Sequence, residues 1–141
     1  MSVLSVSLSG IQAAVAKLNV SAENVANSQT TGALPDAPPS ATSSTPGAPT
    51  VYQPKELASF SVAGSLGGGV TTTVRPSLNK PEYAYAPSAS YANAQGLVAS
   101  PNVDPAVEAV NQIESLQQFK ANLKVFQTGE EMMAIALNLK A

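Results

Sequence analysis

The first 27 residues contain an apolar repeat that constrains the fold more than any other feature of the chain. Starting at Leu4, the apolar positions are separated alternately by four and three residues, which is the 3.5-residue period of a coiled-coil seam. The members of this predicted seam are Leu4, Leu8, Ile11, Val15, Leu18, Ala22 and Val25. The repeat predicts a helix over residues 3–27, about 38 Å long at a rise of about 1.5 Å per residue.

The end of the chain carries a matching repeat. It runs through Leu116, Phe119, Leu123, Phe126, Glu130, Met133 and Leu137, and Glu130 is its only polar member. Asp104 is placed to cap this second helix and Pro105 to occupy its first position. Gly129 predicts a kink or a frayed turn, because glycine destabilises a helix interior by about 1 kcal/mol. Two helices with matching seams pack most economically on each other, as an antiparallel or a crossed pair.

Each predicted helix also has a second stripe, on which we expect contacts with other subunits. The stripe comprises Val6, Ala13, Val20, Asn24 and Asn27 near the start, and Ala121, Asn122, Val125, Met132, Ile135 and Leu139 near the end. A helix with apolar or small residues on two faces can lie between two partners. Asparagine is a poor residue for a helix interior, so Asn24 and Asn27 are interpreted as amides that bond to another subunit's backbone and fix register. The alternative is that Asn27 only ends the helix.

The middle of the chain differs from both ends. Residues 28–54 hold six of the eleven prolines, which predicts an extended or disordered loop. The runs LASFSVAG and VTTTVR flank a glycine-rich turn and predict a β-hairpin, and the segment PEYAYAPSASYANAQGLV predicts a second, smaller one. The expected fold is mainly α with a small β-rich insertion, its two long terminal helices paired as a coiled coil. Its segments are 1–32, 33–54, 55–100 and 101–141.

Composition excludes several classes of function. The chain has no histidine and no cysteine, so the usual general base, thiol nucleophile and metal ligands are missing. We therefore expect no enzyme activity, no cofactor and no metal site. The seven basic residues are scattered, which argues against binding to nucleic acid. No cleavable signal and no run of about 18 apolar residues is recognised, so we expect no membrane span.

The two ends of the chain resemble the flagellar rod, hook and related axial proteins. At the start the resemblance rests on Ser9-Gly10-Ile11, Asn24-Val25-Ala26-Asn27 and Thr30-Thr31-Gly32. At the end it rests on Pro101-Asn102-Val103-Asp104, Glu108 and Phe119-Lys120-Ala121-Asn122. The small size and the Gly67-Gly68-Gly69-Val70 turn are most similar to the proximal-rod members.

The resemblance implies a structural subunit of the bacterial flagellar basal-body (proximal) rod, the periplasm-spanning shaft that transmits torque from motor to hook. It implies a helical tubular assembly with copies of itself, other proximal and distal rod proteins and the basal junction protein. It also implies export through the flagellar type III apparatus without signal cleavage, followed by folding on assembly. The alternatives are another axial or adaptor protein of the same apparatus, or a helical interaction module that does not polymerise.

Overall fold

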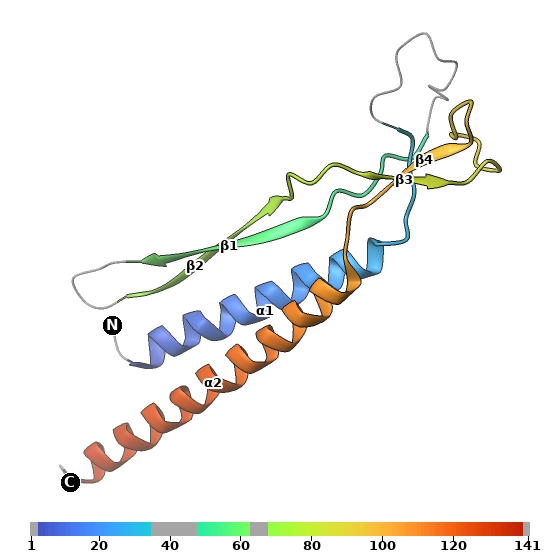
Figure 1. Cartoon of the computed structure of the whole chain (residues 1–141). Coiled ribbons are helices and arrows are strands. Elements are labelled where there is room, and N and C mark those ends of the chain that lie inside the picture. Colours follow the sequence, from blue (N-terminus) through green and yellow to red (C-terminus); the bar gives the residue numbers. More distant parts are fainter. Residues whose placement is uncertain (1–2, 35–47, 63–67, 140–141) are drawn as a thin grey trace.

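The computed structural model of the chain describes residues 3–34, 48–62 and 68–139. Two long helices, α1 (Val3–Asn27) and α2 (Pro105–Asn138), lie side by side and antiparallel (Figure 1). A hairpin of β1 (Lys55–Val62) and β2 (Gly69–Pro76) extends along α1. The architecture therefore confirms the prediction of a mainly helical chain with a small β-rich insertion.

The start of α2 follows the sequence prediction, whereas its interior does not. The Oδ1 atom of Asp104 accepts hydrogen bonds from the backbone amides of Ala106 (2.8 Å) and Val107 (3.4 Å), with Pro105 in the first turn. The helix then continues through Gly129 without interruption, so the predicted kink is wrong. Gly129 is buried, and a Cβ atom there would lie 3.0 Å from Cδ2 of Leu4. The glycine lets the Leu4 side chain lie close against α2.

The contact between α1 and α2 follows a different line from the predicted seam. On α1 it is formed by small and polar residues at spacings of three and four, namely Ser7, Gly10, Ala14, Lys17, Ser21 and Asn24. Four large members of the predicted seam, Leu8, Val15, Leu18 and Val25, are instead 39 to 46% exposed. Ala22 is also exposed, and Leu4 and Ile11 are half-buried. Short side chains let the two backbones approach closely, and the larger residues are left on the outside.

On α2, too, the residues that contact the other helix differ from the predicted seam. Ser115 and Gly129 are buried, and Glu108, Asn111 and Asn122 are half-buried. Phe119 and Phe126 of the predicted seam are half-buried, but Leu116, Leu123, Met133 and Leu137 are exposed. The predicted intramolecular seam is thus corrected on both helices, since most of its large apolar residues face away from the partner helix.

Both predicted hairpins are confirmed. In the longer one β1 pairs antiparallel with β2, from Lys55 opposite Pro76 to Val62 opposite Gly69. In the shorter one β3 (Glu82–Tyr85) pairs antiparallel with β4 (Leu97–Ser100). Gly32, at the end of the Thr-Thr-Gly motif, exchanges two backbone hydrogen bonds of 2.9 Å with Ala99. Residues 35–47 of the predicted proline-rich loop and residues 63–67 of the glycine-rich turn lie outside the described residues.

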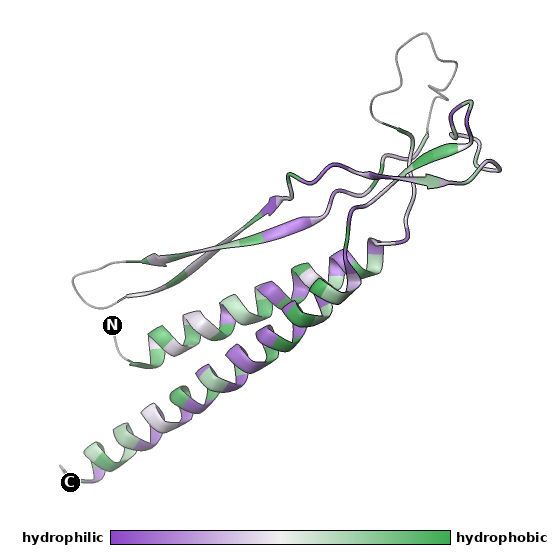
Figure 2. Ribbon diagram, in the orientation of Figure 1, coloured by the Kyte–Doolittle hydropathy of each residue, from purple (hydrophilic) through white to green (hydrophobic). Residues whose placement is uncertain are grey.

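Few apolar side chains are fully enclosed in the part of the chain that the structure describes. The buried apolar residues there are Ala14, Val20, Val98 and Ala99. Figure 2 shows apolar residues recurring along α1 and again toward the end of α2. Contrary to the sequence expectation, α1 contains a stretch that is long and apolar enough to cross a membrane. That is a weak indication, because a core helix of a soluble protein or a signal sequence meets the same criterion.

Candidate assembly interface

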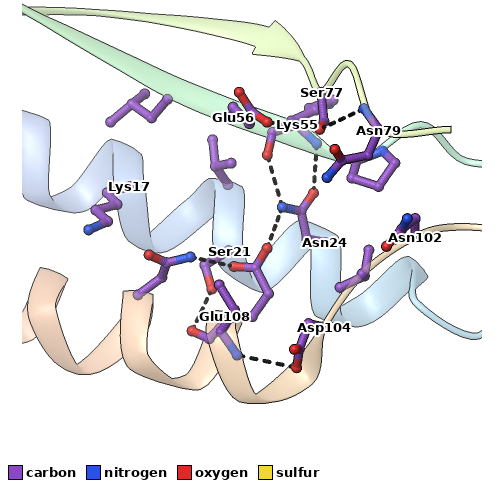
Figure 3. Close-up of a pocket in the computed structure, with 16 residues that line it drawn as sticks. Lys17, Ser21, Asn24, Lys55, Glu56, Ser77, Asn79, Asn102, Asp104 and Glu108 are labelled. Atoms are coloured by element: carbon purple, nitrogen blue, oxygen red, sulfur yellow. Dashed lines mark hydrogen bonds between the residues drawn. The ribbon is translucent and has the colours of Figure 1, made fainter.

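Asn24 is the central residue of a polar network that joins α1, α2 and the hairpin (Figure 3). Its side-chain Nδ2 donates to the backbone oxygen of Lys55 (2.9 Å) and to Oε1 of Glu108 (2.7 Å). Its Oδ1 accepts from the backbone amide of Lys55 (2.9 Å) and from the hydroxyl of Tyr52 (3.0 Å). A carboxamide offers two donors and two lone pairs, so all four positions are used.

The expectation that Asn24 bonds to another subunit is therefore wrong. The residue is only 2% exposed, and its whole hydrogen-bonding capacity is used inside the chain. The physical reason is that the base of the hairpin lies over the last turns of α1 and brings the outward backbone groups of Lys55 against the amide. Its poor helix propensity is offset by these tertiary bonds.

Charged groups surround the network. The Lys55 ammonium lies 2.5 Å from a carboxylate oxygen of Glu23, and this hydrogen bond raises the pKa of Lys55. Burial raises the pKa of the Tyr52 hydroxyl, and the negative charge of Glu23 adds to that effect. On the other side, the Ser21 hydroxyl donates to the backbone oxygen of Glu108 at 3.0 Å. One cluster thus fixes the relative positions of both helices and the hairpin base.

The hairpin has a second attachment near the other end of α1. The Ser9 hydroxyl accepts a hydrogen bond from the Val70 amide at 3.1 Å, and it donates to the backbone oxygen of Val6. Between Ser9 and Asn24 the helix rises by about 22 Å. The six residue-to-residue steps of β1 from Lys55 to Ser61, which pairs with Val70, span about 20 Å. The two lengths agree, so the hairpin follows the helix axis.

The network borders a cleft of about 420 Å³ between the two helices and the hairpin base. Polar side chains such as Lys17, Asn79, Asn102 and Glu108 line it (Figure 3). Lys17 forms an ion pair with Glu114 of α2 at 2.6 Å. Within the described ranges no three His, Cys, Asp or Glu side chains gather to hold a metal ion. The side chains around this cleft hold the elements together and form no recognisable set of reacting groups.

The predicted second stripe divides into inward and outward members. Val20 and Asn24 are buried, and Asn122 faces α1, because a Cβ atom added to Gly10 would lie 2.5 Å from its Oδ1. These three residues are corrected to intramolecular positions. Asn27 is half-buried, and its Nδ2 donates to the backbone oxygen of Glu23 in its own helix. Val6, Ala121, Val125, Met132, Ile135 and Leu139 are exposed, and Ala13 is half-buried.

Sequence reasoning missed the small and polar residues that line the helix contact. Ser7, Ala14 and Ser21 recur every seven residues on α1, and Ser115, Asn122 and Gly129 do so on α2. Their common spacing was the available signal, but only large apolar residues were considered as the face that contacts the other helix. The Ser115 hydroxyl donates to the backbone oxygen of Asn111 at 2.6 Å, which satisfies it inside the contact.

The end of α2 extends past the start of α1. Gly129 lies against Leu4, so the last turns of α2 have little of α1 beside them (Figure 1). A shallow apolar groove lies there, lined by Val3, Leu4, Gly129, Met132, Met133 and Ala136. Together with the outward leucines and valines, it leaves both helices with large apolar surfaces that no described residue covers.

Known proteins resemble this chain over nearly its whole length or over part of it. Flagellar basal-body rod protein FlgC of Salmonella typhimurium is 31% identical over 144 residues, which cover 99% of this chain and 96% of that protein. FlgC of Buchnera aphidicola is 33% identical over 76 residues, covering 53% of this chain and 56% of the relative. The flagellar hook protein FlgE of Rhizobium meliloti is 49% identical over 45 residues, covering 32% of this chain and 11% of the relative. Residues 94–139 match the family described as flagellar basal body rod FlgEFG protein C-terminal.

Proposed function

Because the chain belongs to the flagellar basal-body rod protein family and is a structural subunit of that rod, we propose that it forms the proximal part of the shaft. There it would transmit torque from the motor to the hook. The observation that carries the proposal is the 31% identity to FlgC of Salmonella typhimurium, which extends over nearly the full length of both chains. The mechanical role follows from this position, because a rigid subunit of a rotating shaft passes torque to its neighbours.

The partners we propose are copies of this chain, other proximal and distal rod proteins and the basal junction protein, joined in a helical tube. The outward residues of both helices support this proposal. Large apolar side chains on these faces are exposed to water in the single chain, and a neighbouring subunit would cover them. They include Leu8, Val15 and Leu18 on α1 and Leu116 and Met132 on α2. Full burial of each such side chain stabilises an interface by about 1.5 to 3 kcal/mol. Neighbouring helices would pack on these faces in the manner of a coiled coil.

Export through the flagellar type III apparatus, without a cleaved signal, is the proposed route to the periplasm-spanning rod. The small enclosed core supports it, because a chain that buries few apolar residues alone has little folding energy to overcome before passage. The same feature favours folding that is completed on assembly, when outward apolar faces find their partners.

The test is complementation of a strain that lacks the native copy of this chain. Leu8→Asn combined with Val15→Asn should abolish swimming and leave basal bodies without a complete rod, because both side chains are exposed and lie on one face of α1. Leu8→Ile combined with Val15→Leu, which keeps both positions apolar, is the matched control and should swim normally. Electron microscopy of purified basal bodies and immunoblotting give the readout. Normal rods in the double variant would contradict the proposed interface, and absence of the wild-type chain from basal bodies would contradict the function.

A further inference from the structure

The outer edges of the β1–β2 hairpin carry unused backbone groups. In an antiparallel pair, alternate residues direct their N–H and C=O groups away from the partner strand. Lys55 does so, because both of its backbone groups bond to Asn24, and its partner Pro76 has no N–H to offer. By the same alternation, Leu57 and Ser59 on β1, and Thr72 and Val74 on β2, direct their backbone groups outward.

Among the described residues, helix α1 forms hydrogen bonds to these edges only at their ends. Asn24 binds β1 at Lys55 and Ser9 binds β2 at Val70, so α1 contacts opposite edges at the two ends of the hairpin. Among the described residues, the outward backbone groups of Leu57, Ser59, Thr72 and Val74 have no hydrogen-bond partner. These four residues define a free edge segment on each strand.

The free edges also lack the features that keep strands from pairing with other chains. Soluble proteins protect exposed edges with lysine, proline, bulges or very short strands. Here each strand has eight residues, and no charge or proline occurs from Leu57 to Val62 or from Val70 to Val74. Valine and threonine dominate β2, which favours extended backbone. A two-stranded hairpin is also marginally stable alone and gains from a third strand.

We propose that β2 of one subunit pairs with β1 of the next copy of this chain, antiparallel and in the register that the hairpin already uses. This rests on the proposed function, which places identical copies side by side around a shaft. In that register Thr72 lies opposite Ser59 of the next copy, and Val74 lies opposite Leu57 of the next copy. The outward groups of these residues then form four hydrogen bonds, and the sheet continues from subunit to subunit.

Charge complementarity indicates that the strand on the free edge comes from a second copy of this chain. Inside the hairpin, Arg75 lies 3.8 Å from Glu56. The same register across the subunit boundary places Arg75 beside Glu56 of the next copy, so each subunit contributes one charge at either edge. A shift by one residue would oppose outward groups with inward ones, and a shift by two would separate the charges. Only the unshifted pairing satisfies both conditions.

Disulfide trapping between differently tagged single-cysteine variants tests the pairing, since the chain has no cysteine of its own. Ser59→Cys and Thr72→Cys are expressed together in flagellated cells, so that neither chain can close a disulfide on itself. Opposed residues in such a pair have Cα atoms about 5.5 Å apart, within the range that a disulfide spans. Ser59→Cys with Thr71→Cys, one residue out of register, is the matched control.

We expect a disulfide-linked heterodimer from the 59/72 pair in purified basal bodies, and its loss in the 59/71 pair. Thr72→Pro, which removes one outward N–H, should also prevent rod completion, whereas Thr72→Ala should not. Basal bodies that contain both cysteine variants without the 59/72 link would overturn the pairing and leave the rod function standing. A dominant link between two Ser59→Cys chains would likewise overturn it. Absence of even the wild-type chain from basal bodies would overturn the proposed function itself.

Discussion

Replacing Asn24 by alanine tests whether the polar network holds the hairpin on α1. The change removes three hydrogen bonds to neutral groups, each contributing about 1 kcal/mol, and one to the Glu108 carboxylate that contributes about 1.5 to 3 kcal/mol. The adjacent cleft is open to water, which can form hydrogen bonds with some of the groups that lose Asn24 as a partner. We therefore expect a net loss of about 2 to 3 kcal/mol in the free energy of local opening, roughly half the summed value.

Hydrogen exchange followed by mass spectrometry on assembled basal bodies measures this loss. At about 1.4 kcal/mol per factor of ten, the Lys55 amide should exchange about 30 to 150 times faster in Asn24→Ala. Tyr52→Phe removes a single bond to the same Oδ1 atom, so its effect should be only about fivefold. Unchanged exchange at Lys55 in Asn24→Ala, or equal effects of the two variants, would refute the assignment of Asn24 as the attachment.

Four further outcomes are expected. Gly10→Val should block rod incorporation because its side chain would meet the Asn122 amide, and adding Asn122→Ala should restore part of the incorporation seen on immunoblots. The isolated chain should show low helicity by circular dichroism and gain it when rod partners are added, so a stably helical monomer would argue against folding on assembly. Burial raises the pKa of Tyr52, so its half-buried neutral hydroxyl stabilises the fold below pH 10.0, and this contribution is lost as the pH rises further. Melting of assembled rods between neutral and alkaline pH should show that loss in the wild-type chain, whereas rods of Tyr52→Phe should not show it. Asn27→Ala should keep or improve α1 while weakening rod assembly, and normal motility would contradict this.

Local signals in the sequence were sufficient for the elements themselves. Asp104 and Pro105 located the start of α2. Alternating and β-branched residues around a glycine-rich turn located the longer hairpin, and tyrosines followed by a turn located the shorter one. These features act over a few neighbouring residues, where capping geometry and strand propensity decide the backbone. The Gly129 prediction failed because the same local rule ignores what a missing side chain permits, here the approach of Leu4 from the other helix.

Periodicity could not predict which face of each helix contacts the other helix. A repeat of large apolar residues shows that one face of a helix is covered, but it does not say whether the cover is the same chain or a neighbour. In this protein the small stripe around Ala14 faces inward, and Leu8 and Val15 remain outside. Asn24 was misassigned for a related reason, since its partners Lys55 and Glu108 lie 31 and 84 residues away in the chain.

The two attachments of the hairpin have a mechanical consequence. Ser9 holds the edge of β2 at one end, and Asn24 holds the edge of β1 at the other. The hairpin can therefore neither swing about one attachment nor roll about its own axis without breaking a bond to α1. A sideways force on the hairpin is transmitted to α1 at these two attachments, which lie about 20 Å apart, so the hairpin and the helix turn together.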